Sequence, residues 1–272
     1  MANNTQQQKG TAATSGDMKA SAFEFRFRFL IHAAIFILGF SAPWDRWLHL
    51  DSSGPNAHVW GTLSAHLAML APGTLSIGSA FNLLLILGGV CALVSAWLRT
   101  WASAYMGAAT VHSASMHGDR MVAAGPYRYF RNPLYLGIFI HVFALALFMP
   151  PSGAVFCIVA VGLFELRLIF GEEAFLAAKL GEPYRAYCAR VPRLFPALRP
   201  RVAASATRPA WGLAFLSEIY MWGVVVVFAV EGYRYNARPI VQGIVISLGV
   251  SIVVRALLPQ VKGPELPVVD TE

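Results

Sequence analysis

Long apolar segments constrain the fold of this chain more than any other feature. A helix that spans a bilayer needs about 20 mostly apolar residues. Only 13% of the residues are charged, against about 25% in a typical soluble domain. The sequence therefore predicts an all-α protein, a polytopic bundle of about six transmembrane helices joined by cytosolic and outer segments. The six predicted spans are 27–47, 77–98, 133–149, 153–170, 211–231 and 239–258.

The distribution of basic residues predicts the orientation of these spans. With the N-terminus in the cytoplasm, 17 of the 21 Lys and Arg residues fall in cytoplasmic segments, whereas Arg46, Arg234 and Arg238 lie outside and Arg167 lies within the fourth span. Because cytoplasmic loops are enriched in Lys and Arg, we expect a multi-pass protein of a bacterial inner membrane with both termini in the cytoplasm. The net charge of +7 is spread over the ends of the spans. This spread argues against a nucleic-acid-binding patch and indicates membrane lipids as partners.

Local sequence features divide the chain further. The loop MPPSG (149–153) is too tight for anything but a helical hairpin, and residues 55–72 are predicted to form a short interfacial or re-entrant helix. The first apolar run, from Phe23, is expected to be a retained span rather than a cleavable signal peptide. Four regions result: a disordered cytoplasmic N-terminus (1–22), N-terminal transmembrane helices (23–114), a core with a motif, the hairpin and a cytosolic helix (115–198), and a C-terminal transmembrane hairpin and tail (199–272).

Two unusual motifs flank the predicted hairpin on its cytoplasmic side. Residues 125–137 read GPYRYFRNPLYLG and place Pro, Gly, Arg and Tyr at the mouth of an apolar span. Residues 170–196 read FGEEAFLAAKLGEPYRAYCARVPRLFP, with paired carboxylates, an amphipathic helix and a break at Gly181–Pro183. Both motifs face the same compartment, so a cytosolic active site is expected between them.

Together the motifs resemble the isoprenylcysteine carboxyl methyltransferase family, which is related to the phospholipid methyltransferases. The resemblance covers about residues 115–198, where order, spacing and the intervening hairpin all agree. It implies an integral membrane methyltransferase that binds S-adenosylmethionine between the hairpin and the following cytosolic helix. The eukaryotic pattern has Arg-His-Pro where this chain has Arg131-Asn132-Pro133. Asn keeps a hydrogen-bonding side chain, so it supports a cofactor contact but not a role that needs an ionisable imidazole.

The resemblance and the chemistry of S-adenosylmethionine indicate which residues bind the cofactor. Tyr rings can face the sulfonium or the adenine, and Glu carboxylates can accept hydrogen bonds from the ribose or the ammonium group. A proline stiffens the first turn of the helix, and a glycine permits close approach. The predicted cofactor-binding residues are Gly125, Tyr127, Asn132, Pro133, Tyr135, Gly137, Glu172, Glu173, Tyr184 and Tyr187.

Arg131 and Arg167 are the predicted catalytic residues. A charge such as that of Arg167 costs about 2.5–3.5 kcal/mol at the bilayer centre, so we expect it to pair with Glu165 or, as we favour, to face the active-site cavity. A carboxylate acceptor needs a cation to orient it, an amine needs a base such as Glu172 or Glu173, and a thiol needs a cation that lowers its pKa. The sequence leaves these acceptors open. It predicts methyl transfer to an amphiphilic or lipid-like acceptor at the cytoplasmic face.

The alternative is a non-enzymatic membrane protein, such as a small transporter or a redox-partner subunit. Several His residues in apolar stretches favour it, but the sequence shows no internal repeat and no paired His spacing within a span. We expect His32, His66 and His141 to pack or to form hydrogen bonds between helices. His112 and His117 lie five residues apart without a third ligand, so we expect no metal site. The sequence does not indicate an oligomeric state.

Overall fold

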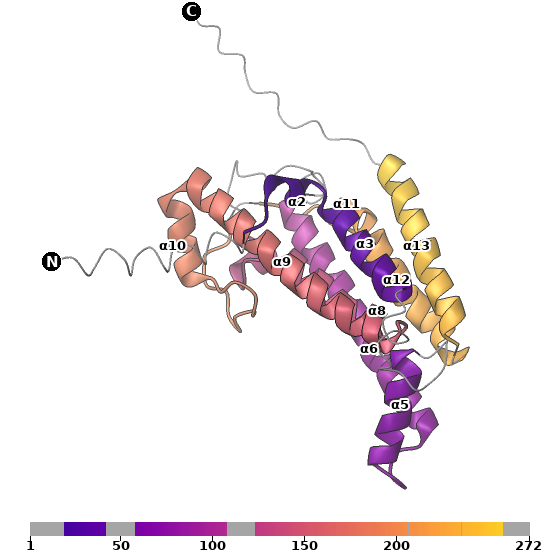
Figure 1. The fold of residues 1–272 in the computed structure, drawn as a ribbon. Helices are drawn as coiled ribbons and strands as arrows, with labels where there is room; N and C mark the ends of the chain where they lie inside the picture. The colour runs from indigo at the N-terminus through magenta and orange to yellow at the C-terminus, as the bar shows by residue number, and fades with distance from the viewer. Residues whose placement is uncertain (1–18, 42–57, 108–122, 206, 235, 258–272) are drawn as a thin grey trace, which may run out of the picture.

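The structure is a computed structural model that describes residues 19–41, 58–107, 123–205, 207–234 and 236–257. Throughout these ranges every regular element is a helix, which confirms the predicted all-α fold (Figure 1). The elements are α2 (Ala22–Arg26), α3 (Arg28–Ser41), α5 (Val59–Leu70), α6 (Ile77–Met106), η1 (Gly125–Arg128), α8 (Pro133–Ala146), α9 (Pro151–Leu180), α10 (Glu182–Arg190), α11 (Trp211–Ser217), α12 (Ile219–Glu231), η2 (Gly232–Arg234) and α13 (Ala237–Leu257).

Several of these helices can cross a membrane. By length and composition, α6, α9 and α13 qualify, and α11 with the α12 segment passes as one broken span bent by 68°. The described helices α3, α5 and α8 are apolar but shorter. The structure thus confirms a polytopic helical bundle, with three or four spans by length where the sequence predicts about six. The exact number of spans stays a prediction.

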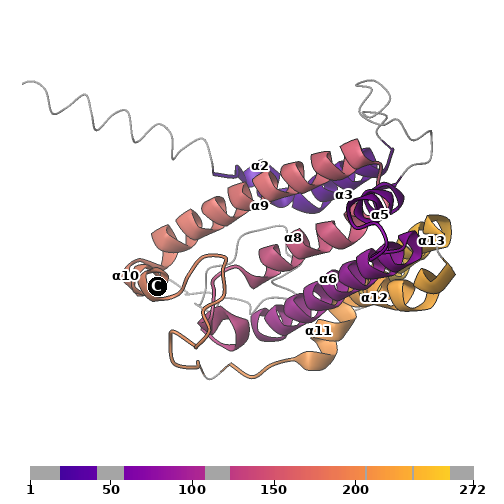
Figure 2. The same cartoon turned by 90° about the horizontal axis from the view of Figure 1, so that it is seen from below.

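The helices form a series of neighbours in space. α3 packs on α9, α9 on α8, α8 on α6, α6 on α12, and α12 on α13. Figure 2 shows this order, with α8 between α9 and α6. In Figure 1, α10 and the C-terminal end of α13 lie toward one end of the bundle, and α5 projects from the other. The two predicted motifs lie at the α10 end.

The α8–α9 hairpin is confirmed, and α5 closes its turn. The backbone N–H groups of Val59 and Trp60 donate hydrogen bonds of 2.9 and 2.8 Å to the carbonyls of Met149 and Leu147. The helix predicted within residues 55–72 therefore exists, and it packs against α6 beside the hairpin turn. These bonds satisfy carbonyl groups that the end of α8 leaves without helical partners.

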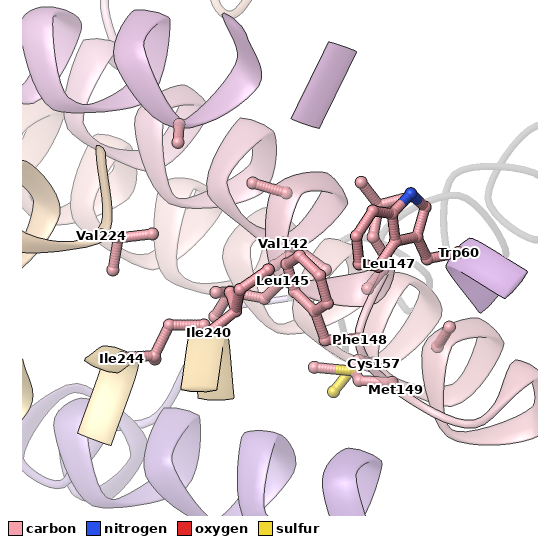
Figure 3. Packing of buried hydrophobic residues seen from close by; sticks show 14 of the residues in the cluster. Trp60, Val142, Leu145, Leu147, Phe148, Met149, Cys157, Val224, Ile240 and Ile244 are labelled. Carbon is pink, nitrogen blue, oxygen red and sulfur yellow. The ribbon is translucent and has the colours of Figure 1, made fainter. Parts of the chain in front are cut away.

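Apolar side chains of several helices meet in the half of the bundle that holds the α8–α9 turn (Figure 3). Phe148 is fully buried, and its ring packs edge-on against Trp60 at 5.6 Å and against Phe228 at 5.3 Å. Elsewhere small residues bring helices together: a Cβ on Gly153 of α9 would overlap the backbone of Gly39 in α3. Such contacts are typical of membrane bundles, where close packing rather than apolar burial drives association.

Candidate functional site

The two motifs that flank the hairpin in sequence lie beside each other in the structure. Residues 123–131, which include η1, run antiparallel to residues 192–205, which follow α10. Four backbone hydrogen bonds of 2.8–3.1 Å join them: Arg131 N–H to the carbonyl of Pro192, Ala197 N–H to Tyr129, Arg201 N–H to Arg128, and Ser205 N–H to Ala123. The segment after α10 therefore fixes the path of the chain into α8.

The first motif begins with a turn that only glycine forms without strain. Gly125 has φ +54°, and the ring of Tyr105 lies directly against its α-carbon. The next residues are tied to α6 and α10, since the Tyr127 hydroxyl donates to Sδ of Met106 and its carbonyl accepts a 2.7 Å hydrogen bond from the Tyr187 hydroxyl. Burial raises the pKa of the Tyr127 phenol well above its usual value, so this side chain stays neutral. Gly125 and Tyr127 thus act as supports of the site.

Asn132 and Glu173 form the centre of a polar cluster, which we call the Glu173 cluster (Arg131, Asn132, Glu173 and Arg193). Asn132 Nδ2 donates to Oε1 of Glu173 at 3.0 Å and to the carbonyl of Arg193 at 3.2 Å. Arg193 Nε donates to Oε2 of Glu173 at 3.0 Å, and its Nη2 lies 2.9 Å from the same oxygen. Arg131 Nε lies 3.4 Å from Oε1.

This geometry explains why an asparagine follows Arg131. Its side-chain amide carries two N–H donors on one nitrogen, and both are used. The contact between Asn132 and Glu173 does not require the residue at position 132 to gain or lose a proton. The carboxylate of Glu173 accepts hydrogen bonds from Asn132 and Arg193, and it lies within ion-pair distance of Arg131. Glu173 therefore holds Arg131 and Arg193 in place.

A pocket of about 600 Å³ lies against the Glu173 cluster. This volume is in the usual range of small-molecule sites, about 300–1,000 Å³. Phe170 of α9 and Tyr184 of α10 contribute aromatic walls, and the Arg193 guanidinium lies 4.7 Å from the centre of the Phe170 ring. Its charged lining is mainly basic, with one carboxylate: Lys19, Arg131, Arg185, Arg193 and Glu173.

Glu172 and Tyr135 lie on a different face of the hairpin. Successive residues of a helix point about 100° apart, so Glu172 turns away from Glu173 and accepts a 2.8 Å hydrogen bond from the Tyr135 hydroxyl. Tyr135 packs toward Phe164 and Leu168. Neither Glu172 nor Tyr135 lines the pocket.

Pro133 and Gly137 shape the start of α8. Pro133 occupies the first helical position, as predicted. Gly137 is buried, and a Cβ there would lie 2.5 Å from Cγ of Arg99. The predicted close approach at Gly137 is therefore made by a side chain of the protein itself.

Arg167 is not part of the pocket wall. Its guanidinium donates to both carboxylate oxygens of Glu24, at 2.9 and 3.0 Å, and to the carbonyl of Lys19 at 3.2 Å. The hydrogen bond from Arg167 lowers the pKa of Glu24 to about 2. Glu165, the other expected partner of Arg167, instead contacts Nε2 of His32 at 2.8 Å.

An ion pair between Arg99 and Glu218 links α6 to the start of α12. The Nε–Oε2 and Nη2–Oε1 distances are 2.7 and 2.9 Å, Ser103 donates to Oε1 at 2.8 Å, and both charged residues are buried. Arg99 also donates to the carbonyl of Leu134 at 3.3 Å, in the first turn of α8. The charge count from sequence places Arg99 in a cytoplasmic segment, but it lies inside the 30-residue α6.

The histidines of the apolar stretches differ in whether they contact another helix. His32 and His141 form contacts between helices, His141 with the Tyr220 hydroxyl at 3.1 Å, which confirms the prediction for both. The prediction for His66 is wrong: it is exposed and contacts the Thr62 carbonyl one turn earlier in its own helix. In the described ranges no three His, Cys, Asp or Glu side chains gather as a metal site would require. His112 and His117 lie outside those ranges.

Comparison with known proteins gives one match. Residues 83–182, from the first half of α6 to the start of α10, match the family model of the phospholipid methyltransferases. No curated protein and no solved structure matches the chain. The matched residues include Arg131, Asn132 and Glu173, and the match confirms the resemblance found in the sequence. Residues 83–182 therefore carry the signature of the phospholipid methyltransferase family, the family of the isoprenylcysteine carboxyl methyltransferase-like membrane methyltransferases.

Proposed function

We propose that this protein transfers a methyl group from S-adenosylmethionine to an amphiphilic acceptor at the cytoplasmic face of a membrane. One observation carries the proposal: the matched segment and α10 enclose a pocket against the Glu173 cluster, at one end of the long apolar helix α9. The acceptor reaches this pocket from the bilayer, and the methyl donor reaches it from the cytosol.

The residues of the pocket fit S-adenosylmethionine. Arg131 lines the pocket and pairs with Glu173 at 3.4 Å, so it supplies a positive charge beside any carboxylate that the ligand brings. Phe170 and Tyr184 present aromatic faces suited to adenine or to a sulfonium. Tyr187 lies behind Tyr184, with ring centres 5.9 Å apart, and supports it.

The protein's own contribution is to bind, align and exclude water. When bound, S-adenosylmethionine supplies a methyl group activated by its positively charged sulfur. Arg131 and Arg185 bind and orient anionic groups, and Glu173 holds Arg131 and Arg193 in position for this task. α10 contributes Tyr184, Arg185 and Cys188 to the pocket wall. Alignment and water exclusion are the main means by which a protein accelerates such a displacement.

An anionic acceptor, a carboxylate or a thiolate, suits this site better than an amine. An amine needs a base, yet Glu173 accepts from Asn132 and Arg193, and Glu172 accepts from Tyr135. An anion needs only a cation in reach, and Arg131 supplies one. This preference concerns the chemical class of the acceptor and names no particular compound.

Binding of S-adenosylhomocysteine to the purified protein tests the proposal. We expect titration calorimetry in detergent to detect binding, and Glu173→Gln to weaken it at least tenfold, about 1.4 kcal/mol. Glu231→Gln is the matched control, because it makes the same chemical change at the end of α12, where Glu231 pairs with Arg234 and neither residue lines the pocket. A radiolabelled methyl-transfer assay with membrane lipids, prenylcysteine analogues and small thiols then identifies the acceptor. A wild-type protein that ignores S-adenosylhomocysteine refutes the proposal and favours the transporter alternative.

A further inference from the structure

The segment of residues 19–26, which we call the N-terminal strap, is fastened to α9 beside the pocket. The backbone N–H of Ala20 donates to the carbonyl of Arg167 at 2.9 Å. Ala20 also lies against Gly171, where a Cβ would approach the Ala20 carbonyl oxygen to 3.1 Å. The strap therefore contacts the backbone of α9 within the segment that matches the family model, although the strap itself lies outside that segment.

Arg167 and Glu24 provide the second attachment of the strap. Glu24 closes a capping box, since its carboxylate accepts from the backbone N–H of Ser21 at 2.7 Å, and Ser21 Oγ accepts from the backbone N–H of Glu24 at 3.2 Å. The same carboxylate accepts both hydrogen bonds from Arg167. A third bond runs from Arg167 to the Lys19 carbonyl. A planar guanidinium can make these three contacts together, whereas an ammonium cannot match this geometry.

The strap ends at the pocket, because Lys19 is one of the residues that line it. We infer that Lys19 is a further ligand-binding residue, which contributes a cation to anionic groups in the pocket, and that Arg167 and Glu24 are positioning residues that hold Lys19 there. This inference rests on the proposed function for the identity of the ligand, the carboxylate of the methyl donor. It also accounts for a charged residue part-way along a membrane helix that makes no contact with the pocket.

Cys188 allows a test that does not depend on any ligand. Its thiol lines the same pocket. We compare the rates at which a sulfonate-bearing and a trimethylammonium-bearing methanethiosulfonate modify Cys188 in the full-length protein, with the modified peptide identified by mass spectrometry. The ratio of the two rates measures the electrostatic potential at Cys188.

We expect Lys19→Met to lower this anion-to-cation ratio by about two- to fivefold, the effect of removing one charge near the pocket. Glu24→Asp and Arg167→Lys lower it in the same direction and less, because they loosen the strap without changing any charge. The control is Lys179→Met, which removes a charge from α9 outside the pocket and leaves the ratio unchanged. An unchanged ratio in Lys19→Met overturns the inference. A ratio that falls in Lys19→Met but stays at the wild-type value in Glu24→Asp and Arg167→Lys overturns the positioning roles.

Binding of S-adenosylhomocysteine separates this inference from the proposed function. If the wild type binds and Lys19→Met binds several-fold more weakly, both stand. If the wild type binds and Lys19→Met binds equally well, the ligand-binding role of Lys19 is refuted and the proposed function stands. If the wild type does not bind, the proposed function fails, and the Cys188 measurement still decides whether the strap supplies the charge.

Discussion

Breaking the Arg99–Glu218 pair should destabilise the protein more than any surface substitution. Glu218→Met leaves the Arg99 guanidinium buried without its carboxylate, and the loss of one partner of a buried pair costs about 3–5 kcal/mol. At roughly 2–4 °C per kcal/mol for a chain of this size, the melting temperature falls by about 6–20 °C. Arg99→Met costs less, because a stranded carboxyl group can take up a proton whereas a guanidinium stays charged.

The double variant Arg99→Met/Glu218→Met gives the decisive comparison. It removes both charges and keeps apolar volume, and such replacements are commonly neutral or stabilising by about 1–4 kcal/mol. We therefore expect its melting temperature in detergent, read from the loss of the monodisperse chromatographic peak, to return to or above the wild-type value. It still lacks the hydrogen bond from Arg99 to the Leu134 carbonyl, beside Asn132. Affinity for S-adenosylhomocysteine should then fall about fivefold, equivalent to about 1 kcal/mol.

Two results would refute this reasoning. A Glu218→Met protein that melts within 2 °C, about the effect of a surface substitution, would show that the pair contributes little to stability. A double variant that melts no higher than the single variants would show that removing the second charge does not restore the stability lost with the first. Ser103→Ala serves as a milder control, because it removes one donor to Glu218 and leaves the ion pair intact.

Four further predictions follow from the site and its supports. Arg131→Lys keeps the positive charge but loses the planar guanidinium, so kcat/KM should fall about ten- to a hundredfold in a methyl-transfer assay. Full activity would show that Arg131 only anchors the helix at the lipid headgroups. The folded-state pKa of Glu24 is about 2, below its ordinary 4.5, so its contribution to stability is fully present above pH 4.5 and is lost as the pH falls toward 2. The melting-temperature difference between wild type and Glu24→Gln should therefore shrink between pH 5 and pH 2, and a constant difference would contradict the ion pair. Tyr187→Phe removes a hydrogen bond to a backbone carbonyl in η1 and should cost about 1 kcal/mol in thermal unfolding, with Tyr233→Phe, at an exposed site, as the silent control. Reporter fusions at the C-terminus and in the 232–238 loop should report opposite sides of the membrane, and equal signals would show that the span count is wrong.

The sequence predicts elements whose signals are local. The MPPSG loop marks the hairpin, and Gly181 marks the end of the helix that carries the paired carboxylates, where the structure has φ +62°. The length of that helix is not predicted. The apolar stretch ends at Phe170, and the sequence suggests a separate helix afterwards, but α9 continues unbroken to Leu180. Burial of one face against the rest of the chain sustains it through polar residues, and this requires tertiary contacts.

Side-chain partners are predicted least well, because they come from distant parts of the chain. Arg99 and Glu218 are 119 residues apart, and each alone reads as an isolated charge in or beside an apolar stretch. Glu172 and Glu173 read as one unit in sequence, yet adjacent positions on a helix face different neighbours, Tyr135 in one case and Asn132 in the other. Arg193 lies within the second motif, yet the sequence does not single it out as a site residue. Only the backbone pairing after α10 brings it to Glu173.

The end of the family match divides the pocket into a part within the matched segment and a part formed by α10. The family match ends at residue 182, just past the Gly181 turn, so the wall formed by α10 lies almost wholly beyond it. α10 contacts the rest of the protein along one stripe, with Tyr184, Tyr187, Cys188 and Val191 spaced as one helical face. Substitutions within this stripe can reshape one wall of the pocket while Asn132 and Glu173 stay in place. In an engineering setting, α10 is therefore the element to exchange when the aim is a new acceptor on an unchanged membrane scaffold.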